Sequence, residues 1–226
     1  MKNTQSGNVL FYILIGVALL AALSYAVSQN SRGSLSALTS QQADLMASEI
    51  IEYAHILSNA ASQIRLRDYQ DTQISLENNN ESGYTNAACT ESECKIFDID
   101  GGGVSWQTIS EQSAASASSK WQITGEMAVQ DIGTTCATDS CTELLALALD
   151  IDSGVCEKIN ENLGIVTPTV IPDNPDAAYA KFTGTYAYAD TIGDVAGSSK
   201  LAAHNAGCFY STADSIYIFY RVLIVR

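Results

Sequence analysis

The N-terminal region carries no charged side chain between Lys2 and Arg32. The stretch 9–27 is apolar apart from two tyrosines, one serine and one glycine. In a helix, about 20 apolar residues rising ~1.5 Å each cover the ~30 Å hydrocarbon core of a bilayer. The sequence therefore predicts a transmembrane helix over residues 8–30, following a short leader-like segment, residues 1–7.

Small residues within this stretch predict a face for helix packing. Ala18, Ala22 and Ala26 recur every four residues and so share one side of the predicted helix, and Gly16 lies in its interior. Small residues at such spacing let helix backbones approach closely inside a membrane. The competing interpretation is that alanine is common in any apolar helix, and the pattern leaves both open.

A second helical pattern follows a polar segment at residues 31–34. Apolar residues recur at intervals of four and three, which marks one face of an amphipathic helix: Met46, Ile50, Tyr53, Leu57, Ala60 and Ile64. Gly33 offers a flexible joint, and Ser34 or Ser36 could cap the new helix. We expect an amphipathic half over residues 34–67, so that residues 8–67 form one long helical region.

The fate of the apolar stretch is open on these grounds. In the triplet Ser24-Tyr25-Ala26, the small residues Ser24 and Ala26 stand at the positions that a signal peptidase recognises. This would favour a secretion signal that is removed. Against this, Lys2 is the only basic side chain ahead of the stretch, and the apolar run continues through Val27 without a polar break. A retained anchor and a helix that packs into an assembly are the alternatives.

The charge balance excludes one class of partner. The formal net charge is −14, the sequence pI is about 4.3, and nearly all acidic residues follow Arg67. An acidic surface repels phosphate backbones, so nucleic-acid binding is excluded, and no polybasic patch exists for anionic lipids. An acidic, solvated surface that aids solubility is the plain interpretation.

Six cysteines, all after residue 88, predict disulfides formed outside the cytosol: Cys89, Cys94, Cys136, Cys141, Cys156 and Cys208. Six cysteines allow fifteen pairings. The loops 89–94 and 136–141 could each close on themselves, which would leave the last two cysteines to pair. A zinc site built from the two C-x4-C pairs is the alternative, with no short-spaced histidine to support it.

Residues 68–226 predict one extracytoplasmic domain with a mostly antiparallel sheet and a short helix. Strand patterns occur at 95–109 around a glycine turn, in WQITGEMAVQDIG and ELLALALDI, and in FTGTYAYA and SIYIFYRVLIV. The helix is expected in DSGVCEKINENLG, capped by Asp152 or Ser153 and ended by Gly164. The predicted fold class is α+β: a long N-terminal helix, first transmembrane and then amphipathic, followed by a disulfide-bearing sheet domain.

No residue pattern predicts catalysis, a metal or a cofactor. DIDGGG resembles part of a calcium loop through Asp98 and Asp100, but Ile109 stands where an EF-hand has its glutamate. His55 is expected on a helix surface or interface, and His204 lies near Cys208, which we expect to be oxidised and so unable to act as a nucleophile. No metalloprotease, serine-hydrolase or phosphate-loop motif occurs. We expect a protein that is not an enzyme.

The arrangement of these segments resembles the type IV pilins and pseudopilins. The shared features are a short polar leader ending in Gly7, an apolar helix that becomes amphipathic, and a C-terminal domain with disulfides. The stretch ELLALALDIDSGVCEKINENLGI is similar to the strand, linker and cysteine-bearing helix of type IVb pilins. The resemblance implies that the cysteine of this helix, Cys156, pairs with Cys208 near the C-terminus.

The resemblance also implies a processing site and partners. A prepilin peptidase would cut between Gly7 and Asn8, and the helix would serve first as an inner-membrane anchor and then as the packed centre of a filament. The implied partners are copies of the chain or other pilin-like subunits, together with an inner-membrane assembly machinery. One position departs from the family: its members usually have glutamate at the fifth residue after the cut, where this chain has Tyr12.

Three functions therefore stand as hypotheses. The first is a structural subunit that is held in the bacterial inner membrane and then assembles into an extracellular or periplasmic type IV pilus or secretion pseudopilus. The second is a membrane-anchored periplasmic or surface binding protein that never polymerises. The third is a secreted domain released after Ala26. The first residue of the mature protein distinguishes them: Asn8 for the subunit, the intact start for the anchor, and Val27 for the secreted domain.

Overall fold

A computed structural model describes residues 7–134, 138–165, 171–175 and 179–226. Within the first helix, side chains are described for residues 11–20 and from residue 40 onward. The chain divides into two compact units, Met1–Gln42 and Ala43–Arg226.

Helix α1 runs from Gly7 to Arg65 and contributes residues to both units. Helical backbone continues through residues 31–34, where the sequence offered a flexible joint. A glycine inside a helix costs only about 1 kcal/mol relative to alanine. Gly33 is therefore too weak a signal to end a helix whose neighbours on both sides favour it.

The transmembrane half of the predicted fold class requires correction. Among the described residues, no helix holds a stretch that is both long and apolar enough to cross a bilayer.

The second unit buries the face of α1 that the sequence pattern marked. Ile50, Tyr53, Leu57, Ala60 and Ile64 are buried, and Met46 is partly buried against the same core. A further row, Ala47, Ala54 and Ala61, is fully buried as well. Because alanine side chains are short, this row brings the helix backbone close to the sheet beneath it.

Six strands form one mixed sheet in the order β3-β5-β6-β2-β1-β4. Their bounds are β1 Lys120–Val129, β2 Glu143–Ile151, β3 Pro172–Asp173, β4 Asp190–Ile192, β5 Ala206–Ser211 and β6 Ile216–Ile224. The pairs β1/β2, β2/β6 and β5/β6 are antiparallel, whereas the short edge strands β4 and β3 pair in parallel with β1 and β5. The described residues also include 3-10 turns, two of them between α1 and β1 and two between strands: Asp71–Gln73, Ser92–Cys94, Asp139–Cys141 and Ser199–Leu201.

Strand β2 lies at the centre of two cores, which explains its unbroken apolar sequence. Leu144, Ala146 and Ala148 belong to the core shared with α1, where Trp121 and Phe219 from the neighbouring strands also lie. The intervening Leu145, Leu147 and Leu149 belong to the second core, on the other face. Successive side chains of a strand point to opposite faces, so a strand buried on both must be apolar throughout.

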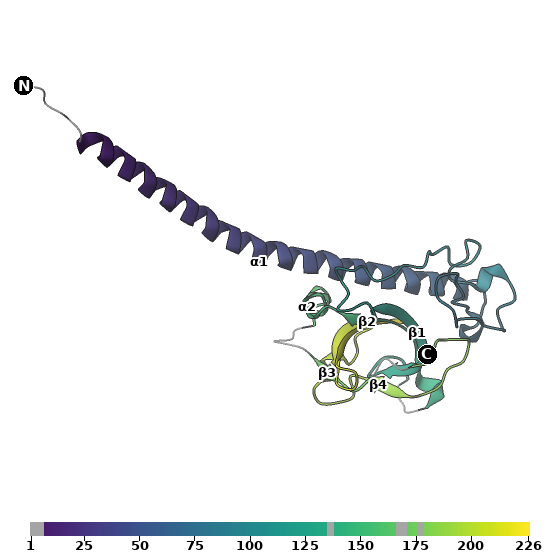
Figure 1. Cartoon of the computed structure of the whole chain (residues 1–226). Coiled ribbons are helices and arrows are strands. Elements are labelled where there is room, and N and C mark those ends of the chain that lie inside the picture. Colours follow the sequence, from purple (N-terminus) through teal and green to yellow (C-terminus); the bar gives the residue numbers. More distant parts are fainter. Residues whose placement is uncertain (1–6, 135–137, 166–170, 176–178) are drawn as a thin grey trace, which may run out of the picture. The chain divides into compact units, whose positions relative to one another are not determined.

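The second core is covered by chain whose described residues hold only short elements, among them β4 and the 3-10 turn Ser199–Leu201. Ile165, Ile171, Ile192 and Leu201 come from the segment between α2 and β5 and pack with Phe209 and Tyr220. In Figure 1 the strands curl around this side, which gives the unit a barrel-like form. The curl lets connecting chain close over apolar side chains that would otherwise face water.

The short helix α2, Ser153–Asn162, lies where the sequence predicted a helix. The Asp152 side chain accepts hydrogen bonds from the backbone N–H groups of Gly154 and Val155, which is a standard N-cap. Gly164 follows the helix with a positive φ of 72°, a conformation that suits glycine.

Two strand predictions are wrong. Residues 95–109 form a glycine turn and extended chain outside the sheet, because the turn packs back on its own start: a Cβ on Gly102 would lie 2.5 Å from the carbonyl oxygen of Ile96. The segment 182–189 follows β1 through spaced hydrogen bonds, such as that of Phe182 N with Ile123 O at 2.9 Å. Regular pairing begins only at Asp190. The predicted fold class is thus corrected to a mostly sheet, barrel-like unit with no membrane span among the described residues.

Candidate functional site

The most unusual surface of the protein is the apolar part of α1 between Phe11 and Leu20. Its large side chains are all exposed, by 41% to 71%: Phe11, Tyr12, Ile13, Leu14, Ile15, Val17, Leu19 and Leu20. A helix that is apolar on every side must be covered by lipid or by other protein, because each exposed side chain costs free energy in water. Over these residues the helix surface is therefore apolar and exposed on every side.

The small residues predicted to pack helices are only partly described. Ala18 is exposed, and a Cβ added at Gly16 would meet no other atom within 4 Å. At 3.6 residues per turn, Gly16 lies about 200° around the helix from Ala18, so it opens a second close-approach point on another side. The side chains of Ala22 and Ala26 lie outside the described residues.

The predicted processing site lies at the edge of the described residues. Residues 1–6 of the leader lie outside them, and α1 begins at Gly7 and continues through Asn8. Tyr12, which occupies the position where pilins usually have glutamate, is 66% exposed. Its phenol adds a polar group to this surface without adding a buried charge.

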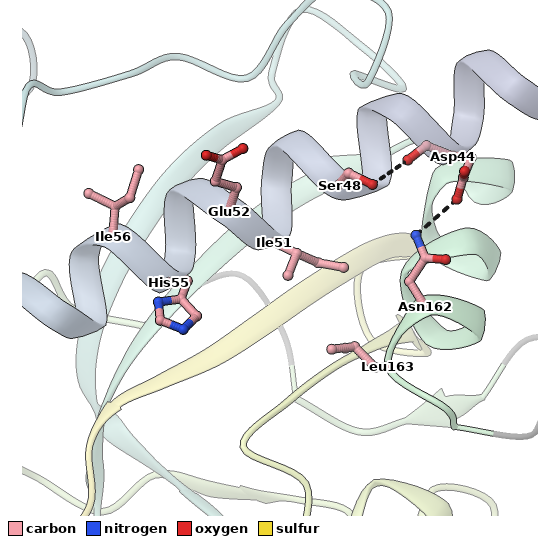
Figure 2. A pocket seen from close by; sticks show the side chains of 8 residues that line it. All are labelled: Asp44, Ser48, Ile51, Glu52, His55, Ile56, Asn162 and Leu163. Carbon is pink, nitrogen blue, oxygen red and sulfur yellow. Dashed lines mark hydrogen bonds between the residues drawn. The ribbon is translucent and has the colours of Figure 1, made fainter.

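An open groove lies on the second unit, between α1 and the end of α2 (Figure 2). Its volume is about 740 Å³, and α1 contributes Asp44, Ser48, Ile51, Glu52, His55 and Ile56, while Asn162 and Leu163 line the other side. The Asn162 Nδ2 donates to Asp44 Oδ1 at 3.0 Å, which ties the two helices together. The lining mixes three apolar side chains with two acidic and three other polar ones.

His55 lies in this groove, on the helix surface as predicted. Its Nδ1 is 2.8 Å from the amide Nδ2 of Asn59, one turn further along α1. General acid–base catalysis by histidine usually relies on a carboxylate or a nucleophile as its partner. The side chain that contacts this ring is an amide, so the arrangement is that of a surface contact.

The cysteines among the described residues are oxidised, as the sequence predicted. Cys89 is bonded to Cys94 and Cys156 to Cys208, and Cys141 is disulfide-bonded as well. Cys136 lies outside the described residues. The bonded sulfurs cannot act as zinc thiolates, and Cys208 cannot act as a nucleophile beside His204. Disulfides of this kind are typical of an oxidising compartment, extracellular or periplasmic.

The aspartates of the DIDGGG segment shape a turn. The Asp98 carbonyl accepts from the N–H groups of Gly101 and Gly103, and its Oδ1 accepts from Asp100 N at 3.1 Å. Across the described part of the chain, no group of three or more His, Cys, Asp or Glu side chains is arranged to hold a metal ion.

One buried polar cluster was not predicted from the sequence. Glu143, at the start of β2, is fully buried, and its Oε2 accepts from Val129 N at 3.0 Å. Its Oε1 and the hydroxyl of Tyr186 are both buried without a hydrogen-bond partner among the described residues. The Arg226 guanidinium lies 3.9 Å from the centre of the Tyr186 ring.

Burial raises the pKa of Glu143 to about 7, although the Val129 N–H and the nearby Arg226 act in the opposite direction. A carboxyl group preceding an apolar run looks like an ordinary strand end in the sequence. Chain from distant segments lies close to it: Thr134 N donates to Arg226 O at 3.1 Å, and a Cβ on Gly133 would lie 3.2 Å from Glu143 Oε1.

Comparisons of this chain with models of protein families, with curated proteins and with solved structures found no match.

Proposed function

We propose that this protein is a structural subunit that assembles with copies of itself, through the N-terminal part of α1, into a filament of the type IV pilus or pseudopilus kind. The observation that carries the proposal is the exposure of Phe11 to Leu20 on every side of the helix. A single partner would cover one side of a helix. A bundle of neighbouring copies covers all of them, as in the core of a helical assembly.

Two further features support this role. The disulfides fit a domain exposed outside the cytosol, where a filament surface lies. Gly16 and Ala18 leave room for close approach of neighbouring helices on two sides. In this proposal the leader is cut between Gly7 and Asn8, and the inner membrane holds the subunit until an assembly machinery adds it to the filament.

Replacing Ala18 by leucine is expected to reduce filament assembly at least tenfold while leaving the amount of protein in the membrane fraction unchanged. Leucine makes the helix more apolar, so anchoring is preserved, but its branched side chain holds neighbouring backbones apart. The measurement is the subunit content of sheared surface material, by immunoblot and negative-stain microscopy, against the content of the membrane fraction.

The matched control is Val17→Leu, which enlarges an exposed side chain about 100° further around the helix. We expect this variant to assemble at close to the normal level. If the unaltered protein yields only monomers under native expression, the subunit proposal fails. N-terminal sequencing tests the proposed cleavage independently, with Asn8 expected as the first residue of the mature chain.

A further inference from the structure

A second pocket, distinct from the groove beside α2, lies within the loops that follow α1. Its volume is about 440 Å³, within the range of small-ligand sites. Its lining includes the loop Asn78–Asn80, the polar residues Asp98 and Ser105, and two aromatic residues, Phe97 and Trp106. None of these residues takes part in the filament contacts proposed above.

The walls of this pocket are held by covalent and backbone contacts. The disulfide Cys89–Cys94 fixes one segment. Ser75 bonds to the residues on both sides of Lys95: its N–H donates to Cys94 O and its carbonyl accepts from Ile96 N, each at 2.9 Å. A binding site that is already ordered loses less conformational entropy when a ligand arrives.

The Asn-rich loop is also a built turn. The Asn78 Oδ1 accepts from the backbone N–H groups of Asn80 at 2.9 Å and Glu81 at 2.7 Å. Its own Nδ2 donates to Leu76 O at 3.1 Å. The exposed side chains of Asn79 and Asn80 are thereby presented at the rim of the pocket as amide donors and acceptors.

The glycine turn lies in the chain between two residues of the lining, Asp98 and Val104. A Cβ on Gly101 would lie 2.0 Å from the carbonyl oxygen of Lys95, so only glycine permits this approach. Asp98 precedes the turn and lines the pocket, and its Oδ1 accepts from Asp100 N at 3.1 Å. The exposed Ser105 adds a hydroxyl to the same lining.

Trp106 supplies the apolar surface. Its ring lies 5.3 Å from the Phe97 ring and 5.9 Å from the Tyr84 ring, measured between centroids, and it remains half-buried. Tyr84 is itself buried, and its hydroxyl accepts from Ile123 N in β1 at 3.0 Å. The indole is therefore held against the core while part of it faces the pocket.

The charges of the pocket exclude an anionic ligand. The only cation in its lining, the Lys95 ammonium, is paired with Glu77 at 2.8 Å. Asp98 then leaves the pocket slightly negative, and the remaining polar groups are neutral amides and a hydroxyl. The matching ligand carries several hydroxyl groups and one apolar face of C–H bonds, without a negative charge.

We propose that this pocket binds a neutral saccharide, whose C–H face packs on Trp106 and whose hydroxyl groups bond to Asn79, Asn80 and Asp98. A single shallow site of this size gives a weak complex, with an expected Kd between about 0.1 and 10 mM. Repetition of the site on many copies of the chain would raise the overall avidity.

Tryptophan fluorescence of the full-length protein tests the proposal, in a detergent without a sugar headgroup. Trp106 is half-buried at the pocket, whereas Trp121 is only 3% exposed in the core. Titration with glucose, galactose, N-acetylglucosamine and their β-linked disaccharides should produce a saturable change for at least one sugar. Inorganic phosphate at the same concentrations should produce none.

Variants locate the binding. Asn80→Ala and Asn79→Ala retain both tryptophans and are expected to weaken the affinity for the responding sugar at least fivefold. Asn162→Ala, at the groove of Figure 2, is the matched control and should leave the affinity unchanged. Absence of a saturable response to every sugar would overturn the proposal. So would a response that both loop variants retain, or one that phosphate reproduces.

Discussion

Replacing both Cys156 and Cys208 by alanine is expected to lower the free energy of unfolding by about 4 kcal/mol. The bond joins residues 52 apart in the sequence, and closing a loop of that length removes much of the entropy of the unfolded chain. It also links α2 to β5, and Asn160 reinforces the link by bonding to both the N–H and the carbonyl of Cys208 at 2.8 Å. Guanidinium unfolding at fixed pH measures the loss as a lower midpoint.

The matched control is the double substitution of Cys89 and Cys94, whose bond closes a loop over only 5 residues. The same entropy relation gives about 2 kcal/mol for this shorter loop. The order of the two losses is the critical result. If the two double substitutions lower the free energy of unfolding equally, the disulfides do not stabilise the protein by reducing the entropy of the unfolded chain.

Glu143→Gln is expected to stabilise the protein above pH 7 by about 1–3 kcal/mol. In the folded state the pKa of Glu143 is about 7, above its ordinary value of 4.5. Between these values the folded protein binds more protons than the unfolded chain, so stability falls as the pH rises from about 4.5 to about 7. Above that range the buried carboxylate is charged, and its Oε1 has no hydrogen-bond partner among the described residues.

The glutamine variant should lose this part of the pH dependence. The amide oxygen of the glutamine can take the place of the glutamate Oε2 and accept from the N–H of Val129. No buried charge forms at high pH. Unfolding midpoints of both proteins between pH 4.5 and 8.5 make the measurement. Glu111→Gln, in an exposed turn, is the control and should follow the unaltered protein. If the difference in stability between the two proteins is constant across this pH range, the pKa of Glu143 is the same in the folded and the unfolded state, and the prediction is wrong.

Several elements could be predicted because their cause is local. The spacing of apolar residues from Ile50 to Ile64 predicted the buried face of α1, and the continuous apolar run of β2 predicted a strand. Asp152 and Gly164 predicted the ends of α2, because a side-chain cap and a positive φ depend on the nearest residues alone. The oxidised cysteines followed from their number and position.

Other features had no local cause. The β-branched and aromatic segment 182–189 has strand propensity, yet the irregular path of its hydrogen bonds along β1 prevents regular pairing. The glycine turn in 95–109 packs on its own preceding residues, so its alternating pattern does not build a sheet. Propensity reports what a segment can do, and packing against distant segments decides what it does.

The sequence by itself determined the apolar surface that surrounds the N-terminal part of α1, since no tertiary contact is needed to make residues 11–20 apolar on every side. The tertiary structure alone decided the burial of Glu143, the groove between α1 and α2, and the pocket beside Trp106. Hydrophobic character belongs to each side chain separately. Enclosure requires groups far apart in the chain to meet, and only the folded packing brings them together.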